Sequence, residues 1–309
     1  MRNLKRALSL ALATVMTLGL MVVGTGAVGY DDVADTDNVE AIEVLQAVGI
    51  MTGDENGNFN PDNTVTRNEM AVIMSQLLNL NYDYYRGTNP FSDVPSWAAP
   101  YVAACAAEGV TSGVGGGLYN GDGNVTAAQA ALMLMKALGY FQYQDDFDDD
   151  WQVATIRQAS YIRLFDGIDA SAETALTRNQ IAQLVLNALK ANMVEFTGDV
   201  GNKITVGDTT LTSGYRPEYS YRTNAASQYN TIDVGTTNIA ENDQYYIQLG
   251  EELYDGDLRL QDSSDVFGRP ARYWEYDGDE IGTYVKNELI RHEYTEKVTG
   301  TDQIGRAHV

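Results

Sequence analysis

One block of sequence occurs three times before residue 196, and this repetition constrains the fold more than any other feature of the chain. Each copy has a threonine at the start of a helix-like run, in Val65-Thr66-Arg67-Asn68-Glu69, Val125-Thr126-Ala127-Ala128-Gln129 and Leu176-Thr177-Arg178-Asn179-Gln180. A Glu or Gln stands three residues after each threonine, which is the spacing of a capping box at a helix N-terminus. The sequence therefore predicts three helices that begin in the same way.

Each copy is predicted to contain a helix, a loop and a second helix. In the first copy, apolar residues recur at helical spacing from Val39 to Val48 and again from Met70 to Leu78, with turn-forming residues at 52–58 between them. One such unit cannot bury its apolar faces alone, so the three copies should share a core. We therefore expect a mainly α fold with three helix-loop-helix repeats in a pseudo-three-fold bundle.

The residues after Phe196 follow a different pattern. Short alternating runs such as 203–206, 245–249 and 273–276 are separated by Gly-Asp and Asn-Asp turns, which is typical of strands. The sequence therefore predicts a β-rich C-terminal region, whose pattern alone indicates no function.

The two ends of the chain carry signals of a different kind. Positive charges at the start precede an apolar stretch from Ala7 to Val23 and then small residues, which is typical of a secretory signal peptide. A membrane-anchoring helix is the alternative, because the apolar stretch is near the lower limit for spanning a bilayer. The last residues, Ile304 to Val309, are those that a common sequencing adapter encodes in one reading frame. We therefore expect the tail to be foreign to the protein and the C-terminal region to be incomplete.

These patterns divide the chain into six segments. They are a signal peptide, three repeats, the β-rich region and the adapter-derived tail, at 1–29, 30–82, 91–140, 141–196, 197–303 and 304–309.

Composition argues against several classes of function. The net charge of -23 would repel nucleic acid and anionic lipid. The single cysteine, Cys105, lies among alanines and can form neither an internal disulfide nor a zinc site, so we expect a small buried helix residue. His292-Glu293 begins like a zinc-protease motif, but Glu296 stands where the second histidine would be. The sequence thus predicts no catalytic residue, no cofactor and no metal site.

Together, the motifs of residues 30–196 resemble the S-layer homology domain, which is found in triplicate in exported bacterial proteins. The resemblance rests on Phe91-x-Asp93-Val94 with Trp97, on the glycine that follows each first helix, and on the Val-Thr-Arg-x-Glu run of the second helix. It implies non-covalent binding to secondary cell-wall polysaccharide, commonly pyruvylated, in grooves between the repeats. It also implies an extracellular location at the cell wall in association with peptidoglycan, and self-association in a surface layer.

The resemblance assigns the family's arginine contact with the anionic sugar to Arg67 and Arg178. A guanidinium can hold a carboxylate by two parallel hydrogen bonds, although the same arginines could be solvated charges in a first helical turn. Ala127 replaces the arginine in the second repeat, so one of the three grooves is expected to be weak or silent. The other ligand-binding candidates stand at motif positions in two repeats each, namely Asp32, Asp93, Gly53, Gly113, Trp97, Trp151, Thr66 and Thr177.

Two of these pairs have a second interpretation. Asp32 and Asp93 could cap helices, which we favour, and Trp97 and Trp151 could be either core residues or aromatic faces for a sugar ring.

Two other functions remain as alternatives to a wall anchor without catalytic activity. One is a wall-associated hydrolase whose catalytic part is missing or lies in the C-terminal region. The other is a calcium-dependent docking module, because Asn120 to Val125 resembles a calcium loop. However, the first and twelfth positions of that loop would be Leu118 and Gln129, which lack the required carboxylates.

Overall fold

The computed structural model describes residues 29–34, 37–147, 150–206, 209–232, 240 and 244–289. Residues 1–28 of the predicted signal peptide and the predicted tail at 304–309 lie outside the described residues. In the part of the chain that is described, no helix is both long and apolar enough to cross a membrane.

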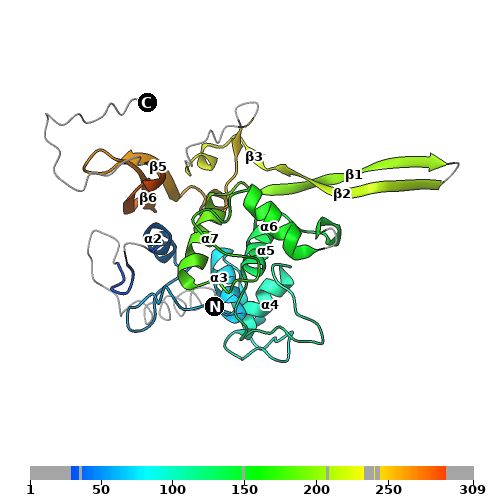
Figure 1. Cartoon of the computed structure of the whole chain (residues 1–309), viewed down its shortest axis with the longest axis horizontal. Coiled ribbons are helices and arrows are strands. Elements are labelled where there is room, and N and C mark those ends of the chain that lie inside the picture. Colours follow the sequence, from blue (N-terminus) through cyan, green and yellow to red (C-terminus); the bar gives the residue numbers. More distant parts are fainter. Residues whose placement is uncertain are drawn as a thin grey trace, which may run out of the picture.

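In the described part of the chain, six helices form the body of the protein, two from each predicted repeat (Figure 1). They are α2 (Val39–Ala47) and α3 (Arg67–Leu77), then α4 (Ala99–Ala107) and α5 (Ala127–Ala137), then α6 (Trp151–Tyr161) and α7 (Arg178–Lys190). Short 3-10 turns, η1 (Tyr82–Tyr85) and η2 (Gln144–Phe147), follow the first and second pairs. The predicted mainly α repeat region is confirmed.

The second helix of each repeat, α3, α5 or α7, begins with the capping box that the sequence predicts. The hydroxyl of Thr66 accepts a hydrogen bond from the backbone N–H of Glu69. In the same way, Thr126 accepts from the N–H of Gln129 and Thr177 from that of Gln180. The carboxylate or carboxamide at that third position accepts the threonine's own N–H in return. Each box satisfies two backbone donors that the helix itself cannot use.

A closed ring of backbone hydrogen bonds joins the three repeats just before these helices. Val65 donates to the carbonyl of Leu176 at 3.0 Å, Leu176 donates to Val125 at 3.2 Å, and Val125 donates to Val65 at 2.8 Å. All three side chains are buried. Because every repeat gives one bond and receives one, the ring has pseudo-three-fold symmetry, as the sequence predicted.

Helices pack between repeats rather than within them. The second helix of each repeat contacts the first helix of another, so that α3 lies on α4, α5 on α6 and α7 on α2. In the centre, α5 also contacts α3 and α7. No repeat can therefore complete its own core without the other two.

The C-terminal part forms small antiparallel sheets. The strands β1 (Val194–Val206) and β2 (Thr209–Tyr221) make a long hairpin that extends away from the helices (Figure 1). Beyond the hairpin, β3 (Thr223–Asn224) pairs with β4 (Tyr245–Tyr246), and the turn η3 (Ser227–Tyr229) lies between them in the sequence. The helix α8 (Leu249–Tyr254) follows. A three-stranded sheet of β5 (Leu258–Ser264), β6 (Pro270–Tyr276) and β7 (Asp279–Val285) and the turn η5 (Asn287–Leu289) come last. The predicted β-rich region is confirmed for its described residues.

The three-stranded sheet packs against α2. Trp274 is fully buried, and its indole N–H donates to a carboxylate oxygen of Glu40 on α2 at 2.7 Å. The hydroxyl of Tyr284 bonds Glu43 on the same helix. Buried side chains of this sheet and of the helical repeats belong to one hydrophobic cluster. The β-rich region and the repeats therefore share a core.

The cysteine behaves as a core residue, as expected. Cys105 on α4 is fully buried, and its thiol donates to the carbonyl of Ala71 at 3.4 Å. Burial raises the pKa of this thiol to about 11, so the reactive thiolate is disfavoured at neutral pH.

Candidate functional site

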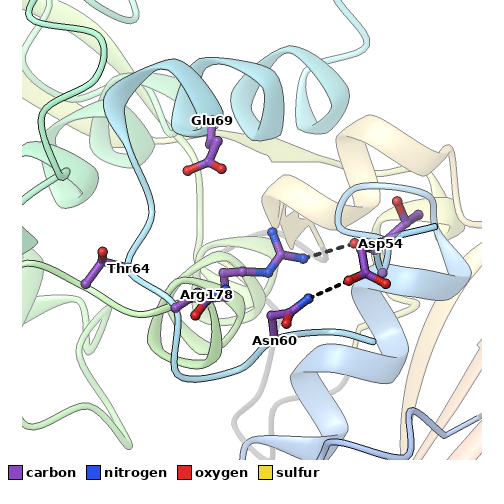
Figure 2. Close-up of a pocket in the computed structure, with 8 residues that line it drawn as sticks. Asp54, Asn60, Thr64, Glu69 and Arg178 are labelled. Carbon is purple, nitrogen blue, oxygen red and sulfur yellow. Dashed lines mark hydrogen bonds between the residues drawn. The ribbon is translucent and has the colours of Figure 1, made fainter. Parts of the chain in front are cut away.

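A pocket of about 400 Å³ lies where the start of α7 meets the loop of the first repeat (Figure 2). We call it the Arg178 pocket, and its lining residues are Thr52, Gly53, Asp54, Asn60, Asn63, Thr64, Glu69 and Arg178. Its size is within the range of small-molecule sites. The pocket exists because the N-terminal residues of α7 donate to this loop, with Arg178 N–H bonded to Asn63 and Asn179 N–H bonded to Pro61.

The guanidinium of Arg178 is held in one position. Its Nε donates to the carbonyl of Phe59 at 2.7 Å and its Nη2 donates to the carbonyl of Thr52 at 2.9 Å. The Phe59 ring supports it from one face, with 4.7 Å between the guanidinium carbon and the ring centroid. Among the described residues the Nη1 group has no hydrogen-bond partner, so it can still donate to a ligand in the half-buried pocket.

Arg67 occupies the equivalent position between α3 and the loop of the second repeat, which we call the Arg67 junction. Its Nε donates to Tyr119 and its Nη2 to Ser112, both at 3.0 Å, and its guanidinium carbon lies 4.4 Å from the centroid of the Tyr119 ring. However, Arg67 is only 7% exposed. The two arginines share a geometry, but Arg178 is the more accessible of the two, being half-buried.

The third junction lacks the arginine. Ala127 and Ala128, at the start of α5, donate their N–H groups to Thr174 and Ala172 in the loop of the third repeat. The backbone arrangement is thus preserved, while the side chain at the arginine position is a fully buried methyl group.

Asp32 and Asp93 accept hydrogen bonds from the backbone of the loops between the two helices of their repeats. They do not cap helices, so the expectation of a capping role is wrong. Asp32 accepts the N–H groups of Phe59 and Asn60 at 2.8 and 2.6 Å. Asp93 accepts those of Tyr119 and Asn120, each at 2.7 Å. The bond from Tyr119 is the main reason why the pKa of Asp93 is lowered. Each carboxylate therefore positions the aromatic residue on which an arginine lies.

Gly53 and Gly113 are required by close packing. A Cβ at Gly53 would lie 2.4 Å from the ring of Tyr30, and one at Gly113 would lie 2.5 Å from the ring of Phe91. The Tyr30 hydroxyl also accepts the N–H of Gly53 at 2.7 Å. Gly53 lines the Arg178 pocket with its backbone.

The two tryptophans lie at the surface instead of in the core. Trp97 is 54% exposed and Trp151, the first residue of α6, is 36% exposed. Neither lines the Arg178 pocket. Thr66 and Thr177 cap their helices, as described above.

Sequence reasoning missed two carboxylates of the pocket, Asp54 and Glu69. Asp54 accepts the N–H group of Asn58, the side-chain amide of Asn60 and the N–H group of Asn56, and these bonds, that from Asn58 above all, lower its pKa to about 2. Glu69 was predicted only as a capping partner. The sequence around Glu69 does not indicate that this side chain also faces the pocket, because the pocket depends on where α7 packs. Among the described residues, no group of three or more potential metal-ligating side chains lies together.

Comparison with known proteins identifies the repeats. Residues 29–71 and 90–131 match the S-layer homology domain, so this part of the chain belongs to that family, whose repeats anchor proteins to the cell wall. The matched residues are those of the first two predicted repeats.

The relatives are bacterial surface proteins for the most part. The chain is 29% identical over 55% of its length to the middle cell wall protein of Brevibacillus brevis, and 25% identical over 91% to a cell surface protein of Thermoanaerobacter kivui. It is also 29% identical over 43% of its length to an S-layer protein of Bacillus thuringiensis subsp. finitimus. The aligned region is 16%, 37% and 16% of these relatives' own lengths. An exoglucanase of Acetivibrio thermocellus matches at 25% identity over 53% of the chain, so the similar proteins include enzymes.

Proposed function

We propose that this chain is an extracellular, non-catalytic wall anchor that binds an anionic secondary cell-wall polysaccharide in the Arg178 pocket. The observation that supports it is a guanidinium fixed by two backbone carbonyls and an aromatic ring inside a cavity between two repeats. An arginine that is already immobilised loses little conformational entropy when it binds, so its remaining N–H groups can bind a carboxylate such as that of a pyruvate ketal with little further cost.

The proposal treats residues 141–196 as a third repeat of the same family. That segment contains α6 and α7, begins its second helix with the same capping box, and supplies Arg178 at the position that Arg67 has in the first repeat. Because α7 contributes the arginine and the first repeat contributes the loop, the pocket forms only when both are assembled. The Arg67 junction is proposed as a secondary site, and self-association in a surface layer is proposed as a further property of the chain.

Sedimentation with bacterial wall sacculi tests the proposal. The full chain should sediment with intact sacculi, and mild acid that removes the secondary polysaccharide should abolish the interaction. Arg178→Ala should reduce binding by about tenfold or more, which is the loss expected for a charge-assisted hydrogen bond. Arg86→Ala is the matched control, because Arg86 is an exposed arginine paired with Asp83 and lies outside the pocket.

Two results would contradict the proposal. One is equal binding of the Arg178→Ala and Arg86→Ala variants to intact sacculi. The other is binding by the unmodified chain that survives removal of the polysaccharide. Far-UV circular dichroism of each variant checks that a loss of binding does not reflect unfolding.

A further inference from the structure

The hairpin of β1 and β2 is anchored to the helical body at its base. There the ring centroid of Phe196 lies 4.7 Å from that of Tyr143, and the hydroxyl of Tyr219 donates to Asp146 at 2.7 Å. Beyond the base the two strands project from the helices (Figure 1), and within the described part of the chain they form a sheet of two strands without a third. A two-stranded sheet is marginally stable in water, so this element gains from an added strand.

Five residues of β1, 202–206, pair in unbroken register with residues 209–213 of β2. Val206 and Thr209 are the last pair before the turn and have two residues between them. In such a hairpin the pair beside the turn exchanges both backbone hydrogen bonds, and bonded and non-bonded pairs alternate from there. Every second residue of each strand therefore directs its backbone N–H and C=O groups away from the hairpin.

On the β1 side these outward groups belong to Lys203 and Thr205, and they form an open edge. Unpaired backbone groups of this kind are a template for another strand. The edge of β2 is less regular, because Pro217 has no N–H group and because two residues of β2, against one of β1, are unpaired where the register shifts. The β1 edge contains no proline and is therefore the better template.

Charge indicates which partner can approach this edge. The chain carries a net charge of -23, so two copies of it repel each other in general. Residues 200–216 are an exception, because the basic residues Lys203 and Arg216 outnumber the single acidic residue, Asp208. Two copies can therefore approach through this part of the hairpin at a lower electrostatic cost than through the chain as a whole.

We infer that β1 is a pairing edge for β1 of a second copy of this chain, so that two hairpins join into one four-stranded antiparallel sheet. The inference rests on the proposed self-association, to which it gives a site. It does not depend on wall binding in the Arg178 pocket, because the hairpin contributes no residue to that pocket.

One register of this pairing uses all of the outward groups and is symmetric. Lys203 of one copy lies opposite Thr205 of the other, so each copy both donates and accepts at these two residues. Ile204 then lies on the two-fold axis, opposite Ile204 of the second copy, as a non-bonded pair. The same register keeps the two copies of Lys203 from lying directly opposite each other.

A pair of proline variants tests the edge. Thr205→Pro removes an outward N–H group of β1, and Thr210→Pro, at its register partner, removes one from the outer edge of β2. Neither change removes a hydrogen bond between β1 and β2, so the hairpin is retained. In sedimentation velocity the full chain and Thr210→Pro should dimerise as the concentration rises. The dimer dissociation constant of Thr205→Pro should be higher by about tenfold or more, because the dimer loses two hydrogen bonds.

Cysteine crosslinking tests the register. With oxidised glutathione, Ile204→Cys should form a disulfide between two copies, because the Cα atoms of a non-bonded antiparallel pair lie about 4.5 Å apart, within reach of a disulfide. Leu211→Cys is the matched control, since Leu211 is the β2 partner of Ile204 and lies away from the second copy. Native Cys105 is buried and stays reduced. Non-reducing electrophoresis should show the crosslinked dimer for Ile204→Cys alone.

The outcomes separate this inference from the proposed wall binding. Dimers that resist Thr205→Pro, or equal crosslinking of Ile204→Cys and Leu211→Cys, would overturn the inference. A full chain that stays monomeric but sediments with sacculi would overturn it too and leave the anchor function standing. Dimerisation that persists in Arg178→Ala, together with wall binding that persists in Thr205→Pro, supports two separate sites.

Discussion

Replacing Arg67 by alanine should destabilise the protein much more than replacing Arg178, although the two arginines donate to equivalent backbone carbonyls in different loops. Arg67 is 7% exposed and holds the carbonyls of Tyr119 and Ser112, one buried and one partly buried. Arg178 is half-buried beside an open pocket. Water can therefore replace the Arg178 side chain, but it has little access to the carbonyls that Arg67 would leave.

The magnitude follows from the contacts that are lost. Each carbonyl that loses a charged donor and stays desolvated costs about 1–3 kcal/mol. The contact of Arg67 with the Tyr119 ring adds about 1 kcal/mol. The expected loss for Arg67→Ala is thus about 3–7 kcal/mol, a large part of the roughly 5–15 kcal/mol that stabilises an ordinary domain. For Arg178→Ala we expect about 1–2 kcal/mol, because solvent can satisfy the exposed partners.

Urea unfolding of the full chain, followed by far-UV circular dichroism, measures both variants. The unfolding midpoint should fall while the slope of free energy against urea stays constant, which indicates a change in stability alone. Arg67→Lys should recover only part of the loss, since a lysine ammonium cannot donate in the planar geometry of the guanidinium. The reasoning is refuted if Arg67→Ala costs less than about 1 kcal/mol, or if both alanine variants lose the same amount.

Three further predictions concern the rest of the protein. The Tyr119 N–H holds the pKa of Asp93 below its usual 3.8, so the stability that this carboxylate provides is complete above about pH 4 and is lost as the pH falls. Between about pH 6 and pH 2, the free energy of unfolding in urea should therefore decrease less in Asp93→Asn than in the unmodified chain. Cys105, with its pKa near 11, should resist alkylation at pH 8 in the folded chain and react once urea unfolds it, as mass spectrometry can follow. Trp274→Ala should cost about 3–5 kcal/mol in the same unfolding assay and should increase hydrogen exchange in α2, because it empties a buried site and leaves Glu40 without its indole donor.

The capping boxes could be predicted from the sequence because all of their atoms lie within four residues. Thr66 and Glu69 satisfy each other wherever the helix is placed, so the pattern is sufficient. The same holds for the apolar stripes of the helices, which specify the faces that must be buried. The number of repeats and the pseudo-three-fold bundle followed from those local signals together with the need of each unit for a partner.

The functional state of each arginine could not be predicted in this way. The carbonyls that hold Arg67 belong to residues 45 and 52 positions away, and those that hold Arg178 are 126 and 119 positions away. Burial of one arginine and exposure of the other depend on the loops of neighbouring repeats, which carry no local signal in the helix itself. The carboxylates Asp54 and Glu69 join Arg178 for the same long-range reason.

The packing of the β-rich region against α2 could not be predicted from the sequence pattern either. Alternation near residues 273–276 indicated a strand, but the partner of its tryptophan, Glu40, precedes it by 234 residues. A fragment that ends at residue 196 would remove the cover of α2 and expose part of the common core. The wall-binding experiments are therefore designed on the full chain.

The placement of the arginines links assembly of the fold to the proposed binding. Arg178 ties α7 of the third repeat to the loop of the first by bonding Phe59 and Thr52, and the same bonds fix the guanidinium in the pocket. A single repeat would therefore present neither the loop nor the oriented arginine, and the pocket would not exist in it. This accounts physically for repeats that occur together, since neither burial of the helices nor formation of the pocket can be completed by one copy. It also implies that a ligand bound between α7 and the first loop stabilises the contact between those repeats, because it binds only the assembled form.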